Sequence, residues 1–329
     1  MTYDPEELKQ QATAMGFRSE SFEKASRLLS LLEAVKSHPF LRSRMALKGG
    51  TALNLFLFDV PRLSVDIDLN YVGTPDRDAM LKERPKVEEA IQAVCSRERL
   101  TVRRAPSEHA GGKWRLSYAN AAGRPGNLEL DVNFMLRVPL WPIALFDSRA
   151  MGTITVKQIP IVDRHELAAG KLAALCARQA SRDLFDACGL LQQKELSLDT
   201  AKLRLAFVIY GGINRKDWRS VHIEDIEADP AEVERELVPM LRSEIAPTKR
   251  TLKIWTAELV KTCRERMSLV LPLAKHEYEF IERLNTRGEI APELLTSDHP
   301  MQDLIRDHPG LKWKALNARK NRESDSPNT

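Results

Sequence analysis

Residues 63–70 read Leu-Ser-Val-Asp-Ile-Asp-Leu-Asn, and apolar and polar side chains alternate along this stretch without a break. A period of two predicts a β-strand that buries one face and leaves the other polar. Asp66 and Asp68 then project from the same face, with their Cα atoms roughly 7 Å apart. Two carboxylates aimed at one point repel each other unless a cation lies between them, and oxygen ligands suit Mg²⁺. Because single pairs of this kind also occur on ordinary solvent-facing strands, the interpretation depends on the neighbouring sequence.

A glycine pair lies upstream of the carboxylates. An apolar stretch at residues 45–47 leads into Lys-Gly-Gly-Thr at 48–51, and the apolar run at 52–58 is expected to form a helix that opens at Thr51. Glycines let a backbone approach a phosphate closely, and free N–H groups at the start of a helix attract anions. The pattern permits a phosphate-binding loop, although taken alone it favours a tight turn with Thr51 as an ordinary N-cap.

A third carboxylate lies on a later predicted strand. Residues 127–134 alternate, and Asp131 falls on the polar face between the apolar Leu130 and Val132. If this strand neighbours residues 63–70, Asp131 completes a site for two metal ions. Two such ions serve the attacking and the leaving oxygen of an in-line phosphoryl displacement. A surface aspartate without a role is the alternative interpretation.

The chain changes character near residue 160, where strand patterns separated by glycine-rich turns give way to helical periodicity. Before that point we expect helices at 21–37 and 78–97, turns at Gly111-Gly112 and 123–126, and strands at 100–102, 114–118, 128–134 and 154–156. After it we expect helices at 164–179, 182–193, 199–210, 231–245, 250–269, 274–286 and 299–307. The predicted organisation is an α/β (α+β) domain over residues 1–162, a helical domain over 163–319 and a disordered polar tail over 320–329.

The composition is that of an ordinary soluble globular protein. Of 329 residues, 43% are apolar and 29% are charged, and no apolar run approaches the 18 or more residues of a membrane span. The first seven residues are acidic with no apolar segment behind them, so we expect no secretory signal. The four cysteines lack metal-ligand or CxxC spacing, so disulfides are not implied. The expected location is the cytoplasm, with no membrane partner.

Basic residues gather in three places, although the formal net charge is only +4. The groups are Arg103-Arg104, Lys249-Arg250, and a C-terminal set of Lys312, Lys314, Arg319, Lys320 and Arg322. Clusters of this size are most often solvated surface. They permit a polyanionic partner without requiring one.

Two groups of motifs together resemble a known family. Residues 47–53 read Leu-Lys-Gly-Gly-Thr-Ala-Leu and residues 62–69 read Arg-Leu-Ser-Val-Asp-Ile-Asp-Leu. Further on, Lys-Leu-Ala-Ala-Leu at 171–175 precedes Arg178 and then Arg-Asp-Leu-Phe-Asp at 182–186. This set resembles the AbiEii-type nucleotidyltransferase toxins of bacterial type IV toxin–antitoxin and abortive-infection systems. The resemblance implies an α/β (α+β) nucleotidyltransferase domain with a mixed sheet, followed by an all-helical C-terminal domain.

The second group of motifs has its own physical interpretation. Lys171 and Arg178 lie seven residues apart on a predicted helix and so share a face. Cations in such a row would hold triphosphate oxygens and stabilise charge on a leaving pyrophosphate. Arg182 can pair with Asp186 at a spacing of four, and Asp183 is a candidate for orienting the lysine or an acceptor group. The alternative for Lys171 is a solvated helix lysine.

These roles and the resemblance together predict a Mg²⁺-dependent nucleotidyltransferase. One or two Mg²⁺ ions would be held by Asp66, Asp68 and Asp131, with Asp131 alternatively acting as base. The NTP would be bound by Lys48, Gly49, Gly50, Thr51, Lys171 and Arg178. The catalytic set is completed by Lys171 and Asp183. The resemblance implies an RNA acceptor, with the 3′ end of tRNA favoured, growth arrest as the result, and a cognate antitoxin encoded beside the enzyme.

Two other functions stay open at this point. The acceptor would instead be a protein hydroxyl or a small molecule such as an aminoglycoside, or the chain would be a non-catalytic module that binds an NTP or RNA. The intact carboxylates argue against the second of these.

Overall fold

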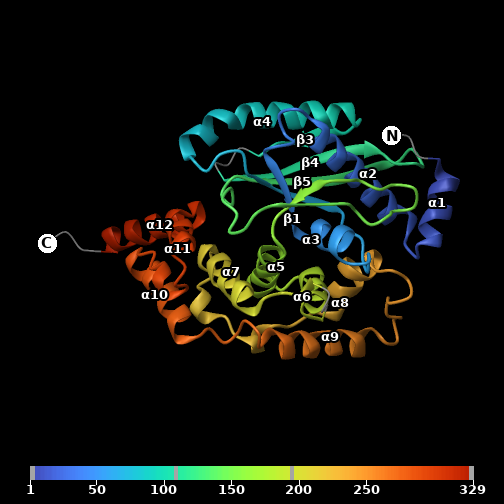
Figure 1. The fold of residues 1–329 in the computed structure, drawn as a ribbon. Coiled ribbons are helices and arrows are strands. Elements are labelled where there is room, and N and C mark those ends of the chain that lie inside the picture. Colours follow the sequence, from blue (N-terminus) through green and yellow to red (C-terminus); the bar gives the residue numbers. More distant parts are fainter. Residues whose placement is uncertain (1–3, 107–109, 193–195, 326–329) are drawn as a thin grey trace. The chain divides into compact units, whose positions relative to one another are not determined.

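The computed structural model describes residues 4–106, 110–192 and 196–325 (Figure 1). The chain forms two compact units. The first unit holds the residues up to Val162 together with Glu234–Arg250, and the second holds Asp163–Val233 and the residues from Thr251 onward. The first unit therefore contains a segment, residues 234–250, that was expected to lie in the helical domain.

A mixed sheet forms the centre of the first unit. Within the described residues it has seven strands in the order β3-β4-β5-β2-β1-β7-β6. The β2–β5 and β1–β7 pairs are parallel, and the other pairs are antiparallel. The strands are β1 (Met45–Lys48), β2 (Asp66–Tyr71), β3 (Thr101–Arg104), β4 (Gly111–Ala119), β5 (Pro125–Asn133), β6 (Ala144–Phe146) and β7 (Ile159–Ile161). The expected mixed sheet is confirmed.

Alternation along the central strands separates an apolar face of this sheet from a polar one. Ile67, Leu69, Leu130 and Val132 are at most 1% exposed, and burial of such side chains stabilises the fold by about 25 cal/mol for each Å² removed from water. Figure 1 shows α4 (Arg77–Arg97) on one side of the sheet and the short α3 (Gly49–Ala52) on the other. Helix α2 (Ser19–Ser37) packs against α4 and β2, and α1 (Pro5–Ala14) packs against α2.

Two expected features of the first unit are wrong, each for a local physical reason. Residues 154–156 form no strand, because Ile154 pairs only with Met151 across a tight turn. The glycines at 111–112 start β4 instead of forming a turn. A glycine is needed at 111 because the strands approach closely there, and a Cβ on Gly111 would collide with the carbonyl oxygen of Val132 in the neighbouring strand.

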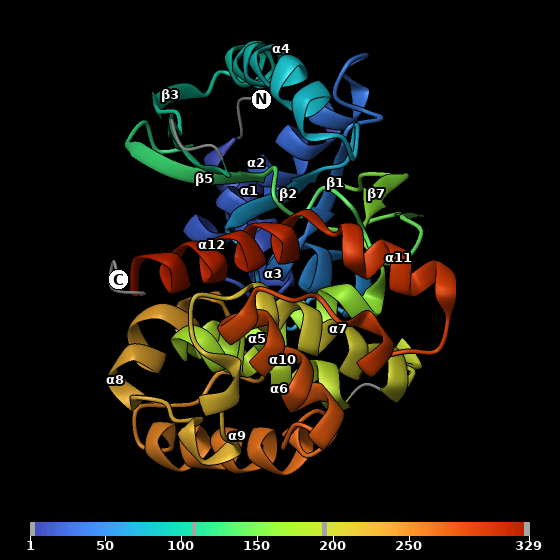
Figure 2. The same ribbon diagram turned by 90° about the vertical axis from the view of Figure 1, so that its left-hand side faces the viewer.

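The second unit is helical, and none of its described residues forms a strand (Figure 2). Within it α5 packs against α6 and α7, α6 against α9, and α10 against α12. Its core includes Trp218, which is fully buried with its ring 5.2 Å from that of Phe207. The helices are α5 (Arg164–Arg178), α6 (Ser181–Gln192), α7 (Thr200–Ile213), α8 (Pro230–Glu232), α9 (Leu252–Met267), α10 (Lys275–Arg287), α11 (His299–Asp307) and α12 (Pro309–Asp325).

The C-terminal stretch departs from the expected disordered tail. Helix α12 continues to Asp325, and only 326–329 of the expected tail lie outside the described residues. Side chains anchor this helix, because Arg319 donates to the carbonyl of Gly288 and Lys314 to that of Asn214. Among the described residues, no helix is long and apolar enough to cross a membrane.

The expected helix at 231–245 is also wrong. After α8 the chain forms a π-helical turn at Val233–Leu237 and a 3₁₀ turn at Val238–Met240. Pro239 cannot donate the N–H that an α-helix needs at that position. The chain then lies beside residues 61–63 of the first unit, with the N–H of Leu63 donating to the carbonyl of Met240 and the N–H of Arg242 donating to that of Pro61.

Candidate active site

The predicted carboxylates lie side by side on two parallel strands. Asp68 on β2 is the Cα partner of Asp131 on β5, and Asp66 is the partner of Glu129. Directly paired residues point to the same face of a sheet, with neighbouring strands about 4.8 Å apart. Four carboxylates thus share one small area of the polar face. The structure brings Asp131 beside Asp68, while the catalytic role of each residue stays a prediction.

Lysines flank this pair of carboxylates on both sides. Lys48 on β1 is the Cα partner of Asp68, and Lys113 on β4 is the partner of Asp131. Burial raises the pKa of Asp131; Lys48 lowers it and Asp68 raises it again, so that the pKa stays above its ordinary value. The anionic form of Asp131 is therefore disfavoured by its surroundings, and a bound cation would favour it.

Glu129 and Lys113 were not singled out from the sequence. Lys113 Nζ donates to Glu129 Oε2 at 2.6 Å, and Arg115 approaches Glu129 Oε1 at 3.7 Å. The hydrogen bond to Glu129 raises the pKa of Lys113. The signal for Glu129 was present, because Glu129 precedes Asp131 by two residues just as Asp66 precedes Asp68.

The glycine loop lies directly against the carboxylates. Helix α3 begins at Gly49, two residues before the expected start, and Gly49 has φ 73°. A Cβ at Gly49 would lie closer than 3.0 Å to Oδ2 of Asp68. Only glycine allows both this backbone angle and this close approach.

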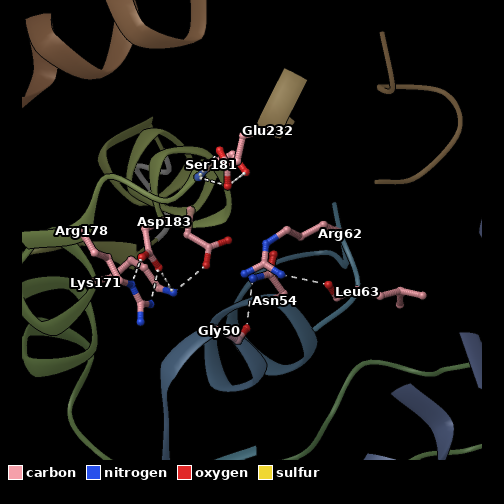
Figure 3. Close-up of polar contacts among 10 residues, drawn as sticks. Gly50, Asn54, Arg62, Leu63, Lys171, Arg178, Ser181, Asp183 and Glu232 are labelled. Atoms are coloured by element: carbon pink, nitrogen blue, oxygen red, sulfur yellow. Dashed lines mark hydrogen bonds and ion pairs between the residues drawn. The ribbon is translucent and has the colours of Figure 1, made fainter. Parts of the chain in front are cut away.

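Thr51 fastens the start of α3 to the carboxylate strand. Its hydroxyl donates to the carbonyl of Asp66 at 2.5 Å and does not cap the helix as the alternative interpretation had it. Asn54 Nδ2 donates to the carbonyl of Gly50 at 3.0 Å (Figure 3). The loop and the strand therefore form one local structure in which backbone and carboxylates face a common space.

The donor set is compatible with magnesium. Among the described residues, no three Asp, Glu, His or Cys side chains are gathered tightly enough to hold a metal ion on their own. Mg²⁺ commonly uses only one or two carboxylates and takes its other ligands from water and substrate phosphates. Asp66 and Asp68 supply hard oxygen donors, and Asp131, whose pKa is raised mainly by burial and further by Asp68, lies beside Asp68.

A second polar cluster lies in the second unit. Lys171 is 8% exposed and pairs with Asp183 Oδ1 at 2.9 Å and with Asp186 Oδ2 at 3.0 Å. Arg178 donates to both oxygens of Asp183, at 2.6 and 3.1 Å (Figure 3). Burial alone would raise the pKa of Asp183, but Lys171 and Arg178 lower it below its ordinary value.

The turn between α5 and α6 produces this cluster. Gln179 ends α5 in the left-handed region, and α6 starts at Ser181, whose N–H and hydroxyl donate to Glu232 (Figure 3). Asp183 in the first turn of α6 then meets Lys171 and Arg178 from α5. Lys171 is not the solvated lysine of the alternative interpretation, because it is buried and contacts Asp183. The role of Asp183 as an orienting acid stays a prediction. Asp186 pairs with Lys171, and its expected pairing with Arg182 stays a prediction.

Comparisons with known proteins bear on both clusters. A family profile described as nucleotidyl transferase AbiEii toxin, type IV TA system, matches residues 30–272. Among solved structures, MenT4, a nucleotidyltransferase toxin from Mycobacterium tuberculosis, superposes with a TM-score of 0.54 at 17% identity, covering 93% of this chain and 97% of that one. At this identity the likeness establishes the fold. No curated protein matches the sequence.

Proposed function

We propose a specific reaction for this chain, which belongs to the AbiEii family of nucleotidyltransferase toxins of type IV toxin–antitoxin systems. The proposed reaction transfers a nucleoside monophosphate from an NTP to RNA, with the 3′ end of tRNA as the favoured acceptor. The observation that carries the proposal is the register that sets Asp68 beside Asp131, with the Gly49 backbone against Asp68. The blocked tRNA would stop translation in the cytoplasm, and a cognate antitoxin would counteract it.

The bond changes define the task of the residues. The acceptor hydroxyl oxygen forms a bond to the α-phosphorus, the bond from that phosphorus to the bridging oxygen breaks, and pyrophosphate leaves with the electron pair. The hydroxyl proton passes to a carboxylate, for which Asp131 is the candidate. Asp66 and Asp68 would hold Mg²⁺, which when bound neutralises charge on the phosphates, and Asp131 is a further metal ligand in the alternative in which it is not the base.

The remaining residues position the nucleotide. Lys48, Gly49, Gly50 and Thr51 would bind the β- and γ-phosphates. Lys171 and Arg178 would bind triphosphate oxygens, and Asp183 would position both cations, since each already donates to it. The Arg178 side chain is 65% exposed, which suits it to contact with a ligand.

The buried position of Lys171 affects how its role is tested. Lys171→Ala would leave Asp183 and Asp186 buried without their shared cation, and loss of one partner of a buried ion pair costs about 3–5 kcal/mol. Arg178→Ala removes an exposed side chain and is the cleaner variant. We expect it to weaken NTP use and to lower thermal stability less than Lys171→Ala does, because Asp183 keeps its contact with Lys171. We expect Lys171→Arg to restore activity only in part.

The test is incubation of purified tRNA with Mg²⁺ and each labelled NTP in turn, followed by a sequencing gel. The wild-type protein should extend the tRNA by one or a few nucleotides. Asp66→Ala and Asp68→Ala should reduce transfer at least about a hundredfold, since a metal ion contributes several kcal/mol to transition-state stabilisation. Asp78→Ala, which removes an exposed carboxylate on α4, is the matched control and should be fully active.

Each alternative has its own outcome in this experiment. Full activity of Asp68→Ala would overturn the mechanism. Label on a protein or a small molecule, with RNA unlabelled, would change the acceptor and keep the reaction class. Binding of NTP without release of pyrophosphate would favour a non-catalytic module.

A further inference from the structure

Cations continue the carboxylate face across the outer strands of the first unit. Lys113 and Arg115 on β4 are the Cα partners of Asp131 and Glu129, so their side chains lie on the same face as the acids. Both side chains are well exposed, at 56% and 62%.

A β-bulge adds two arginines from β3 to the same face. Val102 pairs with Leu116, but Arg104 pairs with Arg115, so that Arg103 and Arg104 together oppose one residue of β4. In a regular strand, consecutive side chains point to opposite faces. Here Arg103 Nε donates to the hydroxyl of Ser117, which lies on the Arg115 face because it follows Arg115 by two. Bulges beside active sites commonly redirect side chains in this way.

On the outer strands β3 and β4, the charges of this face are unbalanced. Strands β3 and β4 contain no aspartate or glutamate. Glu129 on β5 contacts Lys113 and Arg115, and Asp66 and Asp131 also act on Lys113, so the excess of positive charge lies at the β3 side of this face. The excess of positive charge favours an anionic ligand that extends along the outer strands.

The β3 cations lie farther from the carboxylates than Lys113 and Arg115, which are one strand away. The row that starts at Asp66 crosses Glu129 and Arg115 and ends at Arg104. Three strand spacings separate its ends, which corresponds to about 14 Å. A triphosphate held at the carboxylates does not extend that far in addition to its metal contacts, whereas a polynucleotide does.

We propose that Arg103, Arg104, Lys113 and Arg115 bind the phosphodiester backbone of the RNA acceptor and lead its 3′ end to the carboxylates. This inference rests on the proposed function and specifies where that function's substrate binds. It places the main RNA contact on β3 and β4 of the first unit.

Two other basic regions, both in the second unit, are less suited to this role. On α12, Lys312 pairs with Asp307, while Lys314 and Arg319 donate to backbone carbonyls. A cavity of about 530 Å³ beside α9 is lined by Lys253, Lys261 and Arg264, but also by Glu227 and Glu265. Arg264 there donates to the carbonyls of Ile226 and Glu224.

The experiment measures RNA affinity as a function of salt for the full-length protein. The probes are unfractionated tRNA and a labelled single-stranded RNA oligonucleotide. The variant Arg104→Gln/Arg115→Gln removes two exposed cations that lie away from the carboxylate pair. Lys253→Gln/Lys261→Gln removes the same charge from exposed positions on α9 and is the matched control.

We expect Arg104→Gln/Arg115→Gln to bind RNA about tenfold or more weakly at low salt. Its slope of log affinity against log salt should fall by about 1.5, since each lost phosphate contact removes roughly 0.7–0.9. Binding of a non-hydrolysable NTP should be unchanged, and the KM for RNA should rise while kcat is kept. The α9 variant should behave as wild type.

Unchanged RNA affinity and slope in Arg104→Gln/Arg115→Gln, or an equal loss in the α9 variant, would overturn the inference. The two proposals also fail separately. If the wild-type protein labels a protein or a small molecule and binds no RNA, the proposed RNA-binding surface on β3 and β4 is wrong, and the proposed class of reaction, nucleotidyl transfer, stands. If RNA binding depends on Arg104 and Arg115 but no NTP is turned over, the proposed RNA-binding surface on β3 and β4 stands and the proposed reaction is wrong.

Discussion

Gly49 combines an unusual backbone conformation with a close approach to Asp68, a proposed metal ligand. Its φ of 73° lies in the left-handed region, and a Cβ there would collide with the carboxylate of Asp68. Gly123 has almost the same angle, φ 75°, but a Cβ there would meet no atom within 4 Å. Substitutions at these two glycines therefore distinguish two effects: both introduce backbone strain, but only a substitution at Gly49 also displaces the Asp68 carboxylate.

The first prediction compares Gly49→Ala with Gly123→Ala. Both variants should lose about 1 kcal/mol or more of stability, because alanine is strained at positive φ. Only Gly49→Ala should lose nucleotidyl transfer, since Asp68 must move to admit the methyl group. Thermal unfolding and labelled-NTP assays of the two proteins give the comparison. Normal transfer by Gly49→Ala would show that Asp68 need not hold its observed position.

At the scale of elements, the turn between α5 and α6 gathers charge in the interior. Asp183 is 1% exposed and Asp186 is fully buried, and both contact Lys171. Buried charges persist only when they are paired and hydrogen-bonded, so these two helices must stay docked for the pairs to form. The pKa of Asp183 lies below its ordinary value for that reason.

The second prediction follows from this lowered pKa. A carboxyl group whose folded-state pKa is depressed stabilises the fold above its unfolded pKa of about 3.9, and the contribution is lost as the pH falls through the folded-state value. Asp183→Asn should therefore lower the melting temperature markedly at pH 7, and its difference from wild type should shrink as the pH drops below about 4.

Asp307 supplies the control for this pH series. Its pKa is also lowered, by the hydrogen bond from Lys312, but its side chain is 73% exposed. Exposed pairs contribute little to stability, so Asp307→Asn should change the melting temperature only slightly at any pH. A melting-temperature difference for Asp183→Asn that is the same at pH 3 and pH 7 would contradict the assignment.

At the scale of the whole molecule, the first unit is built from two separate parts of the chain. Residues 234–250 return to it after α8, and Leu237 and Leu241 in this segment are 0% and 3% exposed. Arg62, just before the carboxylate strand, pairs with Leu241 in an isolated bridge. The segment therefore supports the stretch that leads into Asp66.

The third prediction concerns this returning segment. Leu241→Ala should destabilise the first unit by about 2–5 kcal/mol, as expected for truncation of a buried leucine. Hydrogen exchange of the β2 and α3 amides should accelerate accordingly. Leu145→Ala, at a side chain that is 56% exposed, is the control and should change stability by less than about 0.5 kcal/mol. Unchanged protection of β2 in Leu241→Ala would mean that residues 234–250 do not support the sheet.

The sequence alone determined the features that depend on local periodicity. Alternation assigned Asp66, Asp68 and Asp131 to the polar faces of their strands, and helical spacing placed Lys171 and Arg178 on one helix. The change from strand to helical patterns near residue 160 is likewise visible in the periodicity of apolar residues along the chain. Such signals are local, because side-chain direction repeats every two residues in a strand and every 3.6 in a helix.

Only the tertiary structure decided which of these faces meet. The pairing of β2 with β5 joins residues more than 60 positions apart and sets Glu129 and Lys113 beside the predicted carboxylates. The bulge in β3, the second acid on Lys171 and the return of residues 234–250 are likewise contacts between distant parts of the chain. Periodicity assigns a side chain to a face but does not choose the neighbouring strand or its register, because that choice depends on how all the apolar faces are buried together.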